Sequence, residues 1–186
     1  MIIAKRHLST MNFKLFHTNN LTLRLINQQV YDFVFGNYSD FEIMSFFRLA
    51  STAELIKEKE KHAKGLSTFN KSFLYFQLFK SGDERIIGEC GFHTWYVDHD
   101  RAEIFYKLFD DADKQKRIMT EAIEFVIDYG FKEMNLHRIE ALIEPKNNAS
   151  LKLAAKMNFI KEGYLKEHYK NNGVMEDSII FALLKN

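Results

Sequence analysis

The stretch RAEIFYKLFDDADKQKRIMTEAIEFVIDYGFKEM, Arg101 to Met134, predicts a strand, a short polar loop and a long helix. Residues 102–109 are rich in apolar and aromatic side chains and run into Asp110-Asp111, a turn signal, so they read as the strand. The helix is predicted by apolar residues spaced three and four apart on one face, namely Ile118, Ala122, Phe125 and Tyr129, joined by Met119 and Val126. Gly130 interrupts this pattern, so we expect the helix to weaken or end there.

The junction between the loop and the helix is a candidate anion-binding turn. A helix begins with unpaired backbone N–H groups and a partial positive charge, and a pyrophosphate can bind at such a place. The same turn carries Lys114, Lys116 and Arg117. Basic clusters are also common on solvated surfaces, so charge alone leaves both an anion site and an exposed basic turn open.

The rest of the chain alternates between strand and helix patterns. Further strands are expected at 21–25, 72–80, 85–96, 137–143, 160–169 and 175–184, and further helices at 27–37, 52–64 with Thr52 as N-cap, and 147–157. The apolar segment 41–49 fits neither pattern clearly. Gly88 and Gly91 lie inside a strand and indicate a bulge or a close backbone contact. This order of elements predicts an α/β (α+β) domain with a mixed sheet and helices on both faces.

Length and composition indicate one globular domain of 186 residues, with 46% hydrophobic and 27% charged residues. Eighteen Phe and eight Tyr predict aromatic packing or an aromatic-lined cleft. With 26 basic and 25 acidic residues, the net charge of +1 gives no electrostatic argument for nucleic acid. No apolar run approaches the roughly 18 residues that span a bilayer, and no long apolar stretch follows Lys5-Arg6, so we do not expect a signal peptide. Met11 is an alternative start.

The single cysteine, Cys90, excludes an intramolecular disulfide and favours a reducing, cytoplasmic location. Within a strand pattern, it reads as a small buried apolar residue. His93, His99 and His137 show no shared metal-ligand spacing, so we expect no metal site.

Several motifs, taken in order, resemble the GCN5-related N-acetyltransferase (GNAT) superfamily. They are Ala102-Glu103-Ile104, the polar loop and Ile118-Met119-Thr120-Glu121-Ala122. Downstream, NLHRIEA at 135–141, EPKN at 144–147, Ser150, Asn158-Phe159 and Glu162-Gly163 are similar to the branch of the ribosomal-protein-alanine N-acetyltransferases. The resemblance covers residues 21–184, and its order and spacing are more specific than any one motif.

The resemblance implies a single GNAT-like domain at 21–186, preceded by an extension and lead-in at 1–20. It implies a mixed, mostly antiparallel twisted sheet of about seven strands with helices on both faces. It also implies acetyl-CoA as donor and co-substrate, an amine as acceptor and no metal. The residues it implies for donor binding are Phe105, Tyr106, Lys107, Leu108, Lys114, Gln115, Lys116, Arg117, Ile118, Met119, Asn147 and Ser150.

The chain departs from the family in its phosphate loop, which usually reads Gln or Arg, two residues, Gly, one residue, then Gly or Ala. Here the run 114–119 is KQKRIM, so Arg117 stands at the usual Gly and Gln115 at a common extra Gly. Glycine allows close approach to phosphate and a positive φ. Phe105 and Asn158 also replace frequent glycines, although Asn tolerates the left-handed conformation.

Glu103 and Ser150 are the candidate catalytic residues. Glu103 lies in an apolar strand, where desolvation can bring a carboxyl pKa close to the operating pH of a general base; it could equally face solvent on an alternating strand. In the resembled branch, the Ser that corresponds to Ser150 is assigned to protonating the leaving thiolate, and many other relatives use a Tyr about a turn later. This chain has Ala154 at that later position, so the resemblance implies Ser150 as the acid. Asn147 and Ser150 also form a helix-capping pattern that needs no function.

Two further parts of the site are expected around these residues. The acyl oxygen would bind backbone N–H groups beside a strand bulge near 104–106. Tyr169, His168 and Asp177 could line the acceptor site, or simply pack in the terminal hairpin.

The leading interpretation is an acetyl-CoA-dependent N-acetyltransferase acting on a primary amine, with a protein N-terminus favoured through the resemblance. Direct transfer in a ternary complex is expected because no nucleophile for a covalent intermediate is evident. The alternatives are a small-molecule amine acetyltransferase (polyamine or aminoglycoside), a non-catalytic acyl-CoA-binding module, and a structural protein without ligand. Nucleic-acid and membrane partners are not expected, and a homodimer is left open.

Overall fold

The computed structural model describes residues 11–65, 72–114, 116–171 and 173–186, and over these residues eight strands form one sheet. Its order is β1-β2-β3-β4-β5-β6-β8-β7, and every pair is antiparallel except β5 with β6. The strands are β1 (Leu15–His17), β2 (Leu21–Ile26), β3 (Ser72–Lys80), β4 (Ile86–Tyr96), β5 (Arg101–Leu108), β6 (Arg138–Ile143), β7 (Ile160–Asn171) and β8 (Val174–Leu184). The mixed, mostly antiparallel sheet is therefore confirmed, with the short β1 added to the strands that the sequence predicts.

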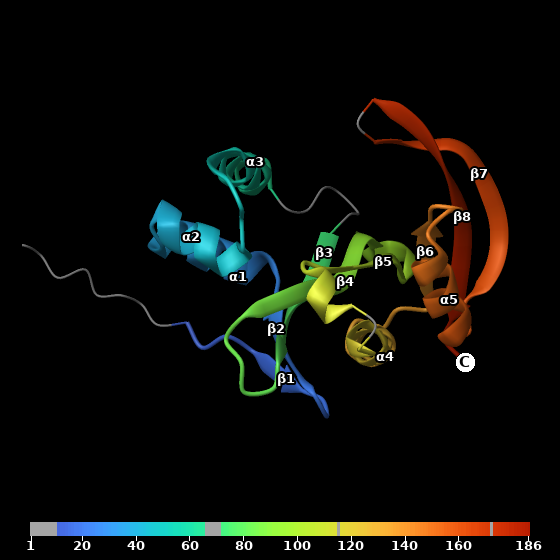
Figure 1. Ribbon diagram of the computed structural model, residues 1–186, viewed down its shortest axis with the longest axis horizontal. Coiled ribbons are helices and arrows are strands. Elements are labelled where there is room, and N and C mark those ends of the chain that lie inside the picture. The colour runs from blue at the N-terminus through green and yellow to red at the C-terminus, as the bar shows by residue number, and fades with distance from the viewer. Residues whose placement is uncertain (1–10, 66–71, 115, 172) are drawn as a thin grey trace, which may run out of the picture.

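Helices cover both faces of this sheet, as expected (Figure 1). They are α1 (Gln28–Asn37), α2 (Asp40–Phe47), α3 (Thr52–Ala63), α4 (Ile118–Lys132) and α5 (Asn148–Lys156), with short 3₁₀ turns η1 (Val97–His99) and η2 (Asp111–Asp113). Helices α1–α3 gather on one side, and α4 lies on the other. Side chains of α4 and α5 pack with the larger core, which includes Phe76, Phe92 and Ile139. Among the residues described, no helix is long and apolar enough to cross a membrane.

The many aromatic residues predicted to pack together do so beneath α1–α3. This second core includes Tyr31, Phe46, Phe47 and Tyr75, all buried. The Tyr31 and Phe47 rings lie 4.7 Å apart between centroids. Such aromatic pairs add stabilisation beyond the apolar area they bury, and they form a rigid wall on this side of the sheet.

Two local predictions need correction, and one segment left open is now assigned. Helix α4 continues past Gly130 to Lys132, because the glycine serves packing: a Cβ there would lie 2.7 Å from Cζ of Phe92. The N-cap of α3 is Ser51, whose side chain accepts from the backbone N–H of Glu54, and Thr52 is already helical. The ambiguous segment 41–49 falls mostly in α2, which begins with a Ser39–Glu42 capping box.

The parallel pair β5–β6 opens the sheet. The two strands pair only from Arg101–Arg138 to Glu103–Glu140. Beyond that point β5 remains paired with β4 as far as Leu108, while β6 remains paired with β8 as far as Ile143. The strands therefore diverge, and the edge of β5 beyond Glu103 borders a gap in the sheet.

The close backbone contact predicted at the glycines of β4 is confirmed at Gly91, where a Cβ would lie 2.3 Å from Cα of Tyr75. The bulge expected near residues 104–106 is wrong. The β4–β5 register is regular from Gly88–Leu108 to His93–Glu103 and shifts only beyond His93, where Thr94 has φ of 48°.

Candidate active site

The divergence of β5 and β6 creates a slot of about 240 Å³. It brings together side chains that are far apart in the sequence. Its lining residues include Glu103, Phe105 and Tyr106 from β5, Asn147 and Ser150 at the start of α5, and His93 from β4. Five of the predicted site residues therefore meet in one place.

Glu103 is the acid at the inner end of this slot. Its side chain is only 12% exposed, so the solvent-facing alternative is wrong. Burial, and then the negative charge of Glu140, raises the pKa of Glu103 to about 7. A carboxylate with this pKa can accept a proton at neutral pH and release it again to solvent.

His93 is a site residue that the sequence analysis missed, since it was weighed only as a metal ligand. It is the cross-strand partner of Glu103, and its Nδ1 lies 3.7 Å from Glu103 Oε2. Its ring stacks on Phe105 at 5.5 Å between centroids, and burial lowers its pKa, which favours the neutral ring. The signal that could have identified His93 is the antiparallel register of β4 and β5, which places it opposite Glu103.

Ser150 faces the slot from the first turn of α5. The N-cap of this helix is Asn147, whose Oδ1 accepts the Ser150 backbone N–H at 3.1 Å. The cap therefore does not use the Ser150 hydroxyl. That hydroxyl is hydrogen-bonded with the phenol of Tyr106, whose pKa is raised by burial. Capping explains Asn147 and leaves the side chain of Ser150 free for chemistry.

The turn before α4 adopts, at Arg117, a backbone conformation that glycine usually supplies. Arg117 has φ of 59° and ψ of 5°, in the left-handed region, and α4 has no side-chain cap. A hollow of about 250 Å³ beside it is lined by Arg117 and Met119 of this turn and by Lys152 and Lys156 of α5. The sequence analysis missed these two lysines because the sequence alone does not show which face of α5 lies next to α4.

The other predicted donor residues are placed as follows. Lys114 pairs with Asp111 at 2.5 Å, Lys116 is exposed, and the side chain of Ile118 is buried in the larger core. Leu108 lines the hollow beside α4, whereas Lys107 faces the opposite side of the sheet. Gln115 lies outside the described residues.

A larger chamber of about 590 Å³ lies on the α1–α3 side of the sheet. Its walls combine aromatic and charged side chains, and His93 and Phe105 line both this chamber and the slot. Glu89, opposite Lys107 on the neighbouring strand, also lines it, and burial raises the pKa of Glu89. The chamber and the slot are therefore neighbours, and the two residues that they share flank Glu103, His93 as its cross-strand partner and Phe105 two residues along β5.

The terminal hairpin contributes one residue near Glu103. The charge of Glu103, after burial, raises the pKa of Tyr169, so these two side chains interact. Asp177 accepts hydrogen bonds from Tyr164 Oη at 2.5 Å and the Glu167 N–H at 2.7 Å. Asp177 is therefore committed to the hairpin, as is His168, which contacts Ser178.

Two substitutions of Arg117 would separate the effect of its charge from the effect of its backbone conformation on CoA binding. Arg117→Ala removes the charge but keeps a non-glycine residue in the left-handed region, so we expect CoA affinity to fall about threefold to tenfold, as for a lost charge-assisted contact. Arg117→Gly removes the charge and also relieves a backbone cost of about 1 kcal/mol, so its melting temperature should rise. Calorimetric titration with CoA and thermal unfolding measure both effects. Equal CoA affinity in wild type and Arg117→Ala would contradict a role for this charge.

A sheet that splays beside a helix N-terminus, with a buried carboxyl at the splay, is the arrangement that the resemblance to acyl-CoA-dependent transferases leads us to expect. The profile of the acetyltransferase (GNAT) domain matches residues 20–160. The chain belongs to the GNAT family, which uses acetyl-CoA, and it is an N-acetyltransferase. The enzyme prediction is thus confirmed over the two non-catalytic alternatives.

Individual relatives agree with this assignment. The chain is 33% identical over 171 residues to the uncharacterized N-acetyltransferase p20 of Bacillus licheniformis, covering 91% of this chain and 95% of that one. It is 30% identical over 128 residues to the ribosomal protein uS5-alanine N-acetyltransferase of Escherichia coli, covering 63% and 62%. The crystal structure of ribosomal-protein-S5-alanine acetyltransferase from Vibrio fischeri is similar with a TM-score of 0.63 and 25% identity, covering 92% and 96%.

Proposed function

We propose that the enzyme transfers the acetyl group of acetyl-CoA directly to a primary amine, and that this amine is a protein N-terminus. The observation that carries the proposal is Glu103, a buried carboxyl with a pKa of about 7 at the meeting of the slot and the chamber. The thioester end of the donor lies in the slot, and the acceptor enters from the chamber. The pyrophosphate lies on the turn at Arg117, where the left-handed backbone leads into the uncapped start of α4.

The chemistry needs three groups. Glu103 takes a proton from the acceptor ammonium, and the free amine attacks the thioester carbonyl. Backbone N–H groups of β5 beyond Glu103, where β6 no longer pairs, stabilise the acyl oxygen. As the C–N bond forms and the C–S bond breaks, the attacking nitrogen gives its second proton to water, and Ser150 gives its hydroxyl proton to the leaving thiolate. Ser150 then recovers a proton through Tyr106 or water.

The acceptor is assigned from the similarity to enzymes named for ribosomal-protein alanine. A chamber open to solvent suits the end of a protein chain. The second candidate is a polyamine, favoured by Glu89, which places a carboxylate among aromatic walls that also attract cations.

An acceptor screen tests this proposal. Peptides with N-terminal Ala or Ser, the same peptides blocked by N-formylation, and spermidine are each incubated with acetyl-CoA, and released thiol is measured. We expect turnover with the free peptides and none with the blocked ones, with intersecting initial-velocity lines as a ternary complex requires. Turnover with spermidine alone would replace the protein acceptor by the polyamine, and turnover with neither, without CoA binding, would refute the donor site.

A homodimer and a cytoplasmic location complete the proposal. The hairpin at the edge of the sheet exposes Ile160 and Val174, at 68% and 63%, which is a surface suited to self-association. The buried thiol of Cys90 agrees with a reducing compartment. Sedimentation equilibrium of the purified protein checks the dimer.

A further inference from the structure

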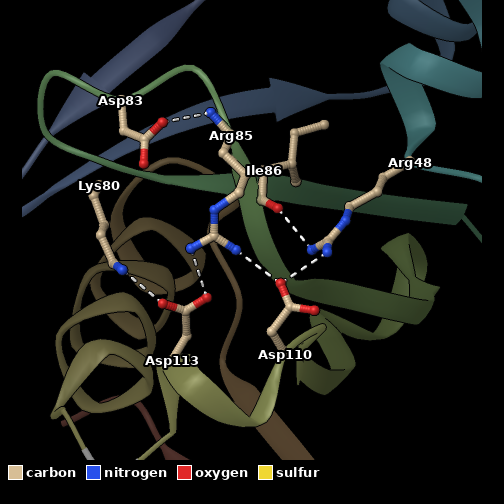
Figure 2. A network of polar contacts seen from close by, with 7 residues as sticks. All are labelled: Arg48, Lys80, Asp83, Arg85, Ile86, Asp110 and Asp113. Carbon is tan, nitrogen blue, oxygen red and sulfur yellow. Dashed lines mark hydrogen bonds and ion pairs between the residues drawn. The ribbon is translucent and has the colours of Figure 1, made fainter.

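A network of ion pairs (Figure 2) holds the η2 loop, which precedes the turn at Arg117. We call the turn at Arg117, where the pyrophosphate is proposed to bind, the phosphate turn. The centre of the network is Asp113, whose side chain is only 1% exposed although it carries a charge. Lys80 Nζ contacts one carboxylate oxygen at 2.6 Å, and Arg85 Nη2 contacts the other at 2.9 Å. Both oxygens are therefore held by cations from the β3–β4 hairpin, and such charge-assisted contacts are the strong ones.

The network continues to the acceptor side of the molecule. Arg85 Nη1 also binds Asp110 at 2.7 Å, and Arg48 Nη2 binds the same Asp110 oxygen at 2.8 Å. Arg48 follows α2, donates to the Ile86 carbonyl at 2.8 Å and lines the chamber. Asp110 and Asp113 thus anchor both ends of the η2 loop to Arg85, in the turn between β3 and β4, as Figure 2 shows.

The position of this loop links the network to the donor. Only three residues separate Asp113 from Arg117, and Asp113 itself lines the hollow beside α4. On the other side of the turn, Glu121 in the first turn of α4 accepts hydrogen bonds from the Asn20 N–H at 2.8 Å and from Asn20 Nδ2 at 2.9 Å. The phosphate turn is therefore fixed on both sides by carboxylates whose own partners are supplied elsewhere in the fold.

Charge gives a second reason for this arrangement. A free carboxylate beside a pyrophosphate would repel it, at a distance where screening by salt is weak. The two cations on Asp113 offset its charge, so the hollow keeps the positive balance of Arg117, Lys152 and Lys156. The turn lacks the glycines that normally let a backbone adapt to phosphate, so its position has to be set from outside.

We propose that Asp113, held by Lys80 and Arg85, is a positioning residue that sets the phosphate turn for the nucleotide half of the donor. The inference rests on the proposed donor site. It follows that loss of Asp113 weakens ligands that carry the nucleotide and spares ligands that lack it. A residue needed only for general stability would affect both kinds of ligand.

The test compares CoA with pantetheine, which lacks the nucleotide, by calorimetric titration of the full chain. For Asp113→Asn we expect the Kd for CoA to rise about tenfold, or about 1.4 kcal/mol, and the Kd for pantetheine to change less than twofold. Lys80→Met, at a side chain 37% exposed, should show the same selectivity with a smaller effect and carries the test if Asp113→Asn does not fold. Asp40→Asn removes an exposed ion pair with Lys59 and is the control, with no change expected for either ligand.

Two results overturn the inference while leaving the proposed function intact. One is an unchanged CoA affinity in the folded variants; the other is an equal loss of CoA and pantetheine. If the wild-type protein binds neither ligand, the donor site itself is wrong, and the inference falls with it. The wild-type titration separates these failures.

Discussion

Replacing Glu103 by Gln is expected to lower kcat by about two to three orders of magnitude, the usual contribution of a positioned general base. The amide keeps the shape of the side chain and its place beside His93, but it cannot take a proton from the acceptor ammonium. The KM for acetyl-CoA should change little, because the proposed nucleotide site is the hollow beside α4, which Glu103 does not line. Steady-state kinetics with saturating donor measures the effect, and Glu124→Gln, at an exposed position of α4, is the matched control that should retain the wild-type rate.

The pH dependence distinguishes a base from a merely structural carboxyl. In the wild type, kcat/KM should rise with pH and level off above a pKa of about 7, as Glu103 ionises. The Gln variant depends on amine that has already lost its proton in solution, so its rate should keep rising toward the pKa of the acceptor. Its deficit is therefore greatest at neutral pH and below. A variant profile with the same shape as that of the wild type would rule out Glu103 as the base.

The same pKa has a consequence for folding stability. The pKa of Glu103 is raised from its ordinary value of 4.5 to about 7, so between these values the folded chain binds more protons than the unfolded chain. Stability from this group is present below pH 4.5 and is lost as pH rises through 7. With partial solvent screening, Glu103→Gln should be more stable than wild type at pH 8 by about 1–2 kcal/mol and equal to it at pH 4, as urea unfolding would show.

Most of the fold could be predicted from the sequence because its signals are local. The helix from Ile118 shows its apolar period within the segment itself, and the strand before it ends at a recognisable turn. Strand β1 lacked such a signal, since three residues are too few to show alternation and its position depends on pairing with β2. The role of Gly130 in α4 was missed for the same reason, because it depends on contact with the ring of Phe92, which lies in β4.

Five residues that line the slot could be named from the sequence, but their burial and their contacts could not. Glu103 could not be assigned to the interior from its neighbours, because its burial depends on the splay of β6 and on the terminal hairpin. The left-handed conformation of Arg117 was not expected for a non-glycine residue. His93 and the ion pairs of Asp113 depend on contacts between segments tens of residues apart, which periodicity does not report.

Ser150→Ala is expected to lower kcat about a hundredfold, because the thiolate of CoA would leave without a proton donor. Stability should hardly change, since the cap of α5 is Asn147 and uses only the backbone N–H of Ser150. Ser150→Thr keeps a hydroxyl and should restore part of the rate. Steady-state turnover at saturating acetyl-CoA measures these differences, and wild-type turnover in Ser150→Ala would exclude this residue as the acid.

The leaving group offers a sharper test of the same role. An acetyl thioester of an acidic aryl thiol releases a thiolate that needs no proton, so the deficit of Ser150→Ala should shrink with such a donor when it is compared with acetylpantetheine. A structural defect would slow both donors alike. Tyr106→Phe removes the hydrogen-bonded partner of Ser150 and should show the same dependence on the thiol in weaker form, because water can still return a proton to the serine. If both Ser150→Ala and Tyr106→Phe lower kcat with acetylpantetheine but not with the thioester of the acidic thiol, the proton that reaches sulfur passes through these two side chains.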